Sequence, residues 1–224
     1  MKIVSFSGID GAGKSTQINA LKAWLGQLGL SVQLLTFWDD VVAFPRFREF
    51  MSHAAFQGDQ GIGSPERPLH RRDKNITSWP VSVIRFGLYL LDAITLCRAT
   101  RRVRRSVTDV VIFDRYIYDE LANLPLNREP ARAFIRVLLK MVPKPDIAYL
   151  LDADPVAALA RKPEYPLEFL RSNREAYLVM SRLAGDITVI EPLSLEATEM
   201  KIRNVFLQKL PGPEEGFSGL PALQ

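Results

Sequence analysis

A glycine-rich segment near the start of the chain carries the residues best suited to chemistry. Residues 8–15 read GIDGAGKS and match the pattern G-x-x-x-x-G-K-[ST]. Glycines let the backbone wrap so that several N–H groups point at one phosphate, and the N-terminus of a following helix adds its dipole. Lys14 can reach the β- and γ-phosphates of a nucleoside triphosphate, and the Ser15 hydroxyl can bind Mg²⁺. The nucleotide-binding residues are expected to be Gly8, Ile9, Asp10, Gly11, Ala12, Gly13, Lys14, Ser15 and Thr16.

A second chemical feature is the acidic residue that follows the apolar run at residues 110–113. Asp114 and Arg115 come directly after this run. The carboxyl ends of strands in an open α/β sheet face the crevice where ligands bind. Asp114 can therefore hold Mg²⁺ or accept a proton, and Arg115 can bind phosphate oxygens through its planar guanidinium. The alternative is an aspartate that caps the next helix, with Arg115 in solvent.

The elements that must position these residues alternate between short apolar runs and helical patterns. The predicted strands cover residues 3–6, 32–37, 110–113, 147–151 and 187–190. The clearest helical patterns cover residues 15–28, 81–104, 130–141, 167–183 and 195–210. Alternating strands and helices indicate parallel pairing through right-handed crossovers, and nearly continuous apolar strands indicate helices on both faces. We predict a three-layer α/β fold of the P-loop NTPase type, with about five parallel strands flanked by helices.

The length of 224 residues fits one domain, which we place at residues 1–210. Residues 57–75 contain three glycines and two prolines and are predicted to be a mobile loop or insertion. Residues 211–224 are predicted to be a flexible tail. One cysteine, Cys97, and no apolar run long enough to span a bilayer favour a soluble cytoplasmic protein with no membrane partner.

The net charge of +4 comes from one segment of the chain. Five arginines lie within residues 98–105, and without them 24 basic residues face 25 acidic ones. A helix end in solvent explains such a run, because its arginines spread around the helix and lie near the negative end of the dipole. A docking surface for an acidic partner is the alternative. No aromatic residues interleave these arginines, so nucleic-acid recognition is not favoured.

These motifs resemble those of the thymidylate kinases, over residues 1–35 and 80–205 in order. Residues 6–16 (FSGIDGAGKST) resemble the opening of that family, and Asp114-Arg115-Tyr116 resembles its Asp-Arg-Tyr motif. Residues 145–161 and 167–177 resemble the segments on either side of the family's lid. The resemblance implies a thymidylate kinase-like nucleoside monophosphate kinase of the P-loop class. Such an enzyme transfers the γ-phosphate of ATP, with Mg²⁺, to a small nucleotide acceptor, dTMP being the family default.

The resemblance also implies roles for individual residues and a homodimer. Asp10 matches the acidic loop residue that contacts the sugar hydroxyl of the acceptor, and Arg115 matches the arginine that holds its phosphate. Tyr89 falls where the family places an aromatic residue that stacks on the base. Arg161 lies at the edge of the lid, where arginines stabilise the transferring phosphoryl group. The expected catalytic residues are Lys14, Arg115, Asp114 and Arg161, and the expected Mg²⁺ ligands are Ser15 and Asp114.

Two more residues are candidates for acceptor binding. Arg85 lies one helical turn before Tyr89, and Trp38 follows the second predicted strand at the edge of the crevice. A core aromatic for Tyr89 and a surface arginine for Arg85 are the alternatives.

The sequence differs from the family pattern in four places. Residues 36–40 (TFWDD) stand where the family has Arg-Glu-Pro-Gly, and Ala93 stands where it has a base-recognising arginine. The lid at residues 162–166 is short and poor in arginine, and residues 119–123 (DELAN) replace the family's polar residues. These differences leave two alternatives: a kinase of the same fold acting on a nucleoside or another small metabolite, or an ATP-binding regulatory or docking module with little turnover.

Overall fold

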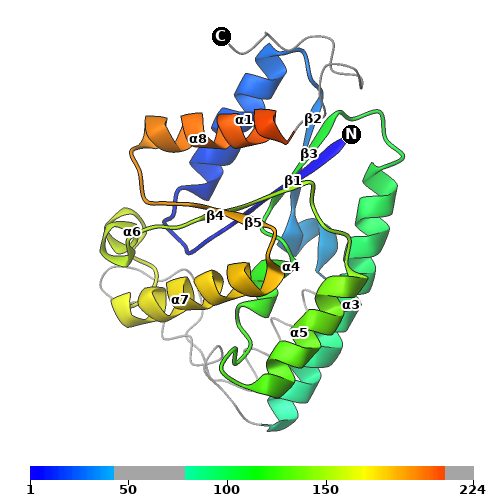
Figure 1. The fold of residues 1–224 in the computed structure, drawn as a ribbon, viewed down its shortest axis with the longest axis vertical. Coiled ribbons are helices and arrows are strands. Elements are labelled where there is room, and N and C mark those ends of the chain that lie inside the picture. Colours follow the sequence, from blue (N-terminus) through cyan, green and yellow to red (C-terminus); the bar gives the residue numbers. More distant parts are fainter. Residues whose placement is uncertain (43–78, 210–224) are drawn as a thin grey trace.

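The structure, a computed structural model, describes residues 1–42 and 79–209. Five parallel strands form one sheet in the order β2-β3-β1-β4-β5 (Figure 1). The strands are β1 (Lys2–Ser7), β2 (Val32–Thr36), β3 (Val110–Asp114), β4 (Ile147–Leu151) and β5 (Ile187–Ile190). The five-stranded parallel sheet confirms the predicted α/β fold, and β4 and β5 have the predicted bounds.

Helices cover both faces of the sheet and complete a three-layer arrangement (Figure 1). The helices packed on one face are α1 (Lys14–Gln27) and α8 (Leu195–Gln208). Those on the other face are α3 (Trp79–Val103), α4 (Ile117–Leu121), α5 (Glu129–Met141) and α7 (Leu167–Ala184). A further helix, α6 (Pro155–Arg161), follows β4. Parallel strands with both faces covered explain why most residues of the strands are apolar.

Alternation along the strands divides the core into two clusters. Val110 and Ile112 of β3 pack on the side of α1 and α8, whereas Val111 and Phe113 pack on the side of α3, α4, α5 and α7. Successive side chains of a strand point to opposite faces, so one apolar run supplies both cores. The same alternation places Ser7, at the end of β1, on the side of α4, where it contacts Asp119.

Local capping explains where several helices begin and end. The Asp154 carboxylate accepts the Ala157 N–H at 2.9 Å at the start of α6, and the Ser194 hydroxyl accepts the Ala197 N–H at 3.2 Å at the start of α8. Gly185, at φ 76°, ends α7 in the left-handed conformation that glycine adopts most readily. The predicted helix ends lie within two residues of the observed ones wherever both are described.

The second strand departs from the prediction at its carboxyl end. It stops at Thr36, whose N–H donates to the Asp40 carboxylate at 2.7 Å, and residues Phe37–Val41 form a π-helix, η1. The predicted strand was therefore one residue too long. Three short helices (η1, α4 and α6) were not among the predicted ranges, because five to seven residues are too few to show a helical period.

Some predictions concern residues outside this part of the chain. The loop at residues 57–75 and the tail at residues 211–224 lie outside the described residues, so the proposed domain bounds stay predictions. Among the helices of the described ranges, none combines the length and the apolar character required to cross a bilayer.

Candidate active site

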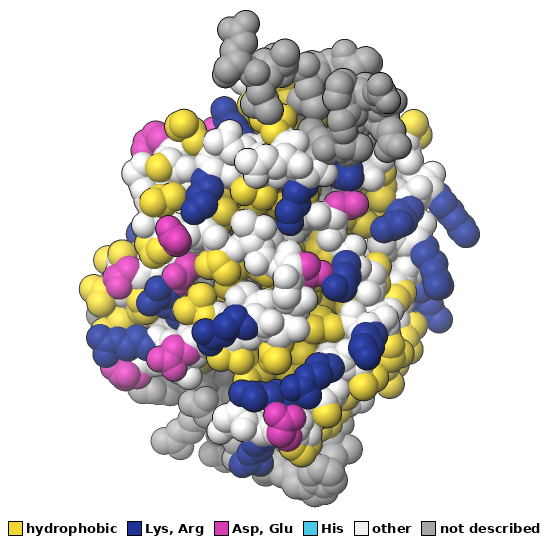
Figure 2. Space-filling model, viewed as in Figure 1, with side chains coloured by type: hydrophobic (Ala, Val, Ile, Leu, Met, Phe, Trp, Pro, Cys, Tyr) yellow, Lys and Arg dark blue, Asp and Glu magenta, His cyan; other side chains and the backbone are white. Residues whose placement is uncertain are grey.

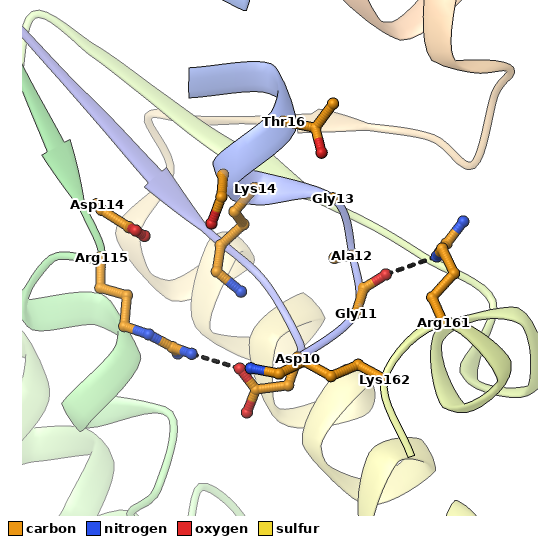
Figure 3. A pocket seen from close by; sticks show the side chains of 11 residues that line it. Asp10, Gly11, Ala12, Gly13, Lys14, Thr16, Asp114, Arg115, Arg161 and Lys162 are labelled. Atoms are coloured by element: carbon orange, nitrogen blue, oxygen red, sulfur yellow. Dashed lines mark hydrogen bonds and ion pairs between the residues drawn. The ribbon is translucent and has the colours of Figure 1, made fainter. Parts of the chain in front are cut away.

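A pocket of about 400 Å³ lies at the carboxyl edge of the sheet, where β1, β3 and β4 lead into their following segments. Its walls come from the glycine-rich loop, the end of β3 and the end of α6 (Figure 3). The lining residues are Asp10, Gly11, Ala12, Gly13, Lys14, Ser15, Thr16, Asp114, Arg115, Arg161 and Lys162. Four cationic and two anionic side chains therefore face one space, a balance that suits a polyanionic ligand.

The glycine-rich loop needs glycine at particular positions. Gly11 adopts φ 80° and Gly13 adopts φ 85°, both in the left-handed region that other residues rarely enter. A Cβ on Gly11 would also collide with the carbonyl oxygen of Ala158 in α6. On Gly8, at φ 146°, a Cβ would lie 2.6 Å from the Leu151 carbonyl oxygen. The loop thus packs its backbone directly against β4 and α6, which only glycine permits.

Lys14 lies inside this loop at the first position of α1. Its ammonium donates to the carbonyl oxygens of Gly8 at 2.8 Å and Ile9 at 2.9 Å, and the residue is 8% exposed. Burial, reinforced by the nearby Arg115 charge, lowers the pKa of Lys14 from 10.5 to about 8, although the carboxylates around the pocket act in the opposite direction. The folded loop therefore holds a lysine whose charge depends on pH near the physiological range.

Arg115 reaches across the pocket to the glycine-rich loop (Figure 3). Its guanidinium lies 2.5 Å from the Asp10 carboxylate, so residues 105 positions apart form an ion pair. Burial works against the charge of Arg115, but Tyr177, Asp119 and Asp10 together raise its pKa further above the ordinary value. Arg115 is thus a permanent cation. Asp114, the residue before it, lines the same pocket from the end of β3.

The remaining wall belongs to α6 and the residue after it. Arg161 ends α6, and its Nε donates to the carbonyl oxygen of Gly11 at 2.8 Å. Lys162 follows and also lines the pocket, while its ammonium lies 3.2 Å from the Glu164 carboxylate. Both cations are exposed, so the end of α6 presents its charge to the pocket and to solvent together.

Behind Arg115 lies a buried carboxylate, Asp119 of α4, which is 5% exposed. It accepts hydrogen bonds from the Ser7 hydroxyl at 2.6 Å and from the Tyr177 hydroxyl at 2.7 Å. Burial, followed by the adjacent Asp119 charge, raises the pKa of Tyr177 well above its ordinary value, so this hydroxyl stays protonated and donates. Asp119 thereby links β1, α4 and α7 beside the pocket.

The comparisons with known proteins agree with this geometry. The probable thymidylate kinase of Methanosphaera stadtmanae is 27% identical over 213 residues, which are 92% of this chain and 98% of that protein. The thymidylate kinase of Bifidobacterium longum strain NCC 2705 is 29% identical over 84% of each chain. Among solved structures, thymidylate kinase from Candida albicans has a TM-score of 0.61 at 16% identity, covering 93% of this chain and 92% of that one. No family model matches the chain.

This chain is thymidylate kinase-like. The sequence comparison carries the statement, because a structural likeness at 16% identity shows the fold alone. The prediction of a thymidylate kinase-like family with a P-loop fold is confirmed.

The structure of this thymidylate kinase-like chain brings all four predicted catalytic residues into one pocket. Lys14, Asp114, Arg115 and Arg161 all line it, from three separate segments of the sequence. Gly8 and Ile9 do not line it but accept the hydrogen bonds of Lys14. The roles of these residues stay predictions, which the proposal below takes up.

Of the predicted acceptor residues, Asp10 and Arg115 line the pocket, whereas Tyr89 and Trp38 lie elsewhere in the thymidylate kinase-like fold. Tyr89 of α3 is 5% exposed and belongs to the apolar core, and Trp38 of η1 is 40% exposed. Neither lines the pocket. Arg85 belongs to α3, but its side chain lies outside what the structure describes. The pocket therefore contains the phosphate side of the predicted site and not its base-recognition side.

Sequence reasoning missed two parts of the site. Lys162 directly follows Arg161 at the lid edge, and this position is the signal that identifies it. Asp119 and Tyr177 gave none, because 58 residues separate them and only the fold brings them together.

The donor set of the pocket fits Mg²⁺. Ser15 and Asp114 offer a hydroxyl and a carboxylate oxygen to the same space, and Mg²⁺ prefers oxygen ligands. No group of three or more His, Cys, Asp or Glu residues suited to a metal occurs within residues 1–42 and 79–209.

Proposed function

We propose that the chain transfers the γ-phosphate of MgATP to a nucleoside monophosphate, and that dTMP is the acceptor. The observation that carries the proposal is the pocket in which the glycine-rich loop, Asp114, Arg115 and Arg161 meet. The named relatives support the same reaction, since those aligned over most of this chain are called thymidylate kinases or probable thymidylate kinases.

In this proposal the loop binds the triphosphate through its backbone N–H groups and through Lys14. The left-handed glycines Gly11 and Gly13 shape the loop, and α1 directs its N-terminus at the same place. Lys14 exchanges its contacts with the Gly8 and Ile9 carbonyls for phosphate oxygens. A ligand with negative charge favours the ammonium form of Lys14 and offsets the effect of burial.

Ser15 and Asp114 hold the metal in this proposal. Bound Mg²⁺ neutralises phosphate charge and orients the triphosphate. Asp114 is the last residue of β3, which pairs with β1. The carboxyl ends of these two paired strands therefore fix both the glycine-rich loop and the Asp114 carboxylate. The two oxygen ligands are thereby placed by backbone hydrogen bonding within the sheet and within the first turn of α1.

Arg115 and Arg161 supply the remaining positive charge. Arg115 holds the acceptor phosphate next to Asp10, which contacts the acceptor's sugar hydroxyl, and Arg161 faces the transferring group from the side of α6. Phosphoryl transfer needs few covalent steps from the protein, so catalysis consists of positioning and of neutralising charge. The arrangement of four cations around one space provides both.

The test is a panel of nucleoside monophosphates incubated with MgATP and the full chain, with ADP release as the measured quantity. Lys14→Ala is the inactive reference. Lys22→Ala is its matched control, because Lys22 is an exposed lysine of the same helix. We expect phosphorylation of dTMP by the wild type and by Lys22→Ala, and only background with Lys14→Ala.

Two outcomes contradict the proposal. The first is phosphorylation of the corresponding nucleosides but of no monophosphate, which indicates a kinase for an uncharged hydroxyl acceptor. The second is tight binding of MgATP with no acceptor-dependent ADP release, which indicates a regulatory or docking module.

A further inference from the structure

The Asp119 carboxylate does not line the pocket, yet it contacts the arginine that does. Asp119 Oδ1 lies 3.5 Å from Nη1 of Arg115, so the two residues, four positions apart in the sequence, form an ion pair. The same oxygen accepts the Tyr177 hydroxyl at 2.7 Å, and Oδ2 accepts the Ser7 hydroxyl at 2.6 Å. Burying a carboxylate costs free energy unless hydrogen bonds and opposite charges compensate for the lost water. These contacts provide that compensation, and they fix the position of Asp119.

Asp119 also holds the backbone next to Arg115. Arg115 adopts φ 69° and is the one residue other than glycine with a left-handed φ in the described part of the chain. Its own N–H donates to the Phe6 carbonyl at 2.9 Å, and the next N–H, that of Tyr116, donates to Asp119 Oδ2 at 3.0 Å. An unfavourable conformation persists only where its surroundings hold it, and here a hydrogen bond is present on each side of it.

The guanidinium of Arg115 therefore lies between two carboxylates. Asp10 binds it from the glycine-rich loop, and Asp119 binds it from the core side of α4. Asp10 is partly exposed in the pocket, whereas Asp119 is buried behind it. A ligand can exchange the first contact, but the second stays with the protein.

We propose that Asp119 is the positioning residue of Arg115, and that Ser7 and Tyr177 act by fixing Asp119. Asp119 sets the direction of the guanidinium through its charge, and it sets the left-handed backbone through the Tyr116 N–H. The effect on phosphoryl transfer rests on the proposed function, in which Arg115 holds the acceptor phosphate. A carboxylate that only capped the start of α4 would change the stability of the chain without acting through Arg115.

The first test is a double-mutant cycle with Asp119→Asn, Arg115→Ala and the double variant, assayed for MgATP-dependent phosphorylation of dTMP. We expect Asp119→Asn to lower kcat/KM by about tenfold or more, through the KM for dTMP, and to change the KM for ATP by less than about twofold. In the Arg115→Ala background we expect the same change to have less than about a threefold effect. Equal losses in both backgrounds would overturn the proposal.

Asp109→Asn is the matched control. Asp109 accepts the Ser31 hydroxyl at 2.7 Å and the Ser31 N–H at 2.8 Å, which parallels the contacts of Asp119 with Ser7 and Tyr116. It lies before β3, at the sheet edge opposite the pocket. We expect no change in the KM for dTMP, and a change as large as that of Asp119→Asn would count against positioning.

The second test needs no turnover. The side-chain N–H signals of Arg115 in an NMR spectrum of the full chain are assigned by their loss in Arg115→Ala. We expect Asp119→Asn to shift and broaden these signals, and Tyr177→Phe and Ser7→Ala to do so to a smaller extent. Tyr177→Phe and Ser7→Ala keep the test decisive if Asp119→Asn does not fold.

The two tests separate failure of this proposal from failure of the proposed function. A wild type that phosphorylates no monophosphate defeats the proposed function, and the NMR measurement then decides the positioning role alone. Arg115 signals that stay unchanged in every folded variant overturn the positioning role whatever the chain phosphorylates.

Discussion

The guanidinium of Arg115 and the carboxylate of Asp10 form an ion pair at 2.5 Å inside the pocket. The proposed function gives each group a different part of the acceptor, the phosphate to Arg115 and the sugar hydroxyl to Asp10. An acceptor that contacts both groups must replace their mutual contact with its own. The pair thus makes acceptor affinity depend on both charges at once.

Asp10→Asn tests this dependence. The change removes the charge that Arg115 faces and the carboxylate that accepts the sugar hydroxyl, so we expect the KM for dTMP to rise about tenfold. The KM for ATP changes little, because the loop backbone and Lys14 hold the triphosphate. Steady-state kinetics with each substrate varied in turn measures the two values.

The control for Asp10→Asn is Glu168→Gln, which removes an exposed ion pair with Arg171 on α7. Exposed pairs contribute little, so we expect wild-type kinetics and an unfolding free energy within about 0.5 kcal/mol of wild type. A rise in the KM for ATP equal to that for dTMP in Asp10→Asn would place Asp10 on the ATP side instead.

The pKa of Lys14 predicts how nucleotide binding depends on pH. With a pKa of about 8, Lys14 is protonated below pH 8 in the folded chain, and above that pH the binding of an anion requires uptake of a proton. We expect the affinity for MgATP to be flat below pH 8 and to fall toward tenfold per pH unit above it. Isothermal titration calorimetry from pH 7 to 9.5 measures the MgATP affinity. We expect the change of slope near pH 8 to be absent in Lys14→Ala and present in Lys22→Ala.

The same pKa predicts that the free energy of unfolding rises with pH, whereas the affinity for MgATP falls. The folded pKa of about 8 lies below the ordinary value of 10.5, so between these pH values the unfolded chain binds more protons than the folded chain. The free energy of unfolding then rises with pH, at up to about 1 kcal/mol per pH unit. We define the difference as the free energy of unfolding of the wild type minus that of Lys14→Met, both measured by urea unfolding. We expect this difference to be constant below pH 8 and to become more positive from pH 8 to 9.5. A difference that stays constant throughout would show that Lys14 keeps an ordinary pKa.

Two glycines separate the cost of a left-handed backbone from the cost of a collision. Gly11 and Gly29 have φ of 80° and 77°, but a Cβ on Gly11 meets the Ala158 carbonyl, whereas a Cβ on Gly29 meets nothing within 4 Å. We expect Gly29→Ala to cost about 1–2 kcal/mol of stability and to leave MgATP affinity unchanged. Gly11→Ala should cost more and should lower MgATP affinity by at least about tenfold, because the loop and α6 must move apart. Thermal unfolding and calorimetry on both variants provide the comparison, and equal affinities would contradict the role of the packed loop.

These residues also show how far the sequence predicts the molecule. The loop and the strands were predictable because their signals are local: a glycine pattern of fixed spacing, and short apolar runs bounded by turns. The positions of Asp114 and Arg115 followed from the rule that strand ends face the ligand crevice. Local rules of this kind account for the sheet, the main helices and the phosphate side of the pocket.

The contacts of Asp119 with Ser7 and Tyr177 were not predictable, since they join residues 112 and 58 positions apart. The direction in which a helical side chain points was not predictable either. Tyr89 of α3, for example, lies in the core instead of lining the pocket. Both depend on how α3, α4 and α7 pack on the sheet, which no single segment encodes.

Arg161 is predicted to act through the geometry of its guanidinium. Its Nε donates to the Gly11 carbonyl at 2.8 Å, which leaves the other nitrogens of its planar group for phosphate oxygens. Lysine keeps the charge but has no such fork, so we expect Arg161→Lys to lower kcat by at least about tenfold with little change in stability. Arg171→Lys on α7, where Arg171 binds the exposed carboxylate of Glu168, is the control. Wild-type kcat in Arg161→Lys would show that Lys162 or charge alone suffices.

The arginines of residues 98–105 are predicted to take no part in turnover. All five are exposed, around and after the last turns of α3, on the side of the molecule where Figure 2 shows several Lys and Arg side chains. The chain then enters β3 at Val110, which pairs with Lys2 at the start of β1. The pocket lies beyond the other ends of these strands, about 15 Å away along a five-residue strand, more than a Debye length at physiological ionic strength. We therefore expect the triple variant of Arg101→Gln, Arg102→Gln and Arg105→Gln to keep kcat and both KM values within about twofold of wild type at 0.15 M salt. A loss of turnover that depends on protein concentration would instead assign the arginines to an assembly that the reaction requires, and a loss independent of concentration would assign them to the reaction itself.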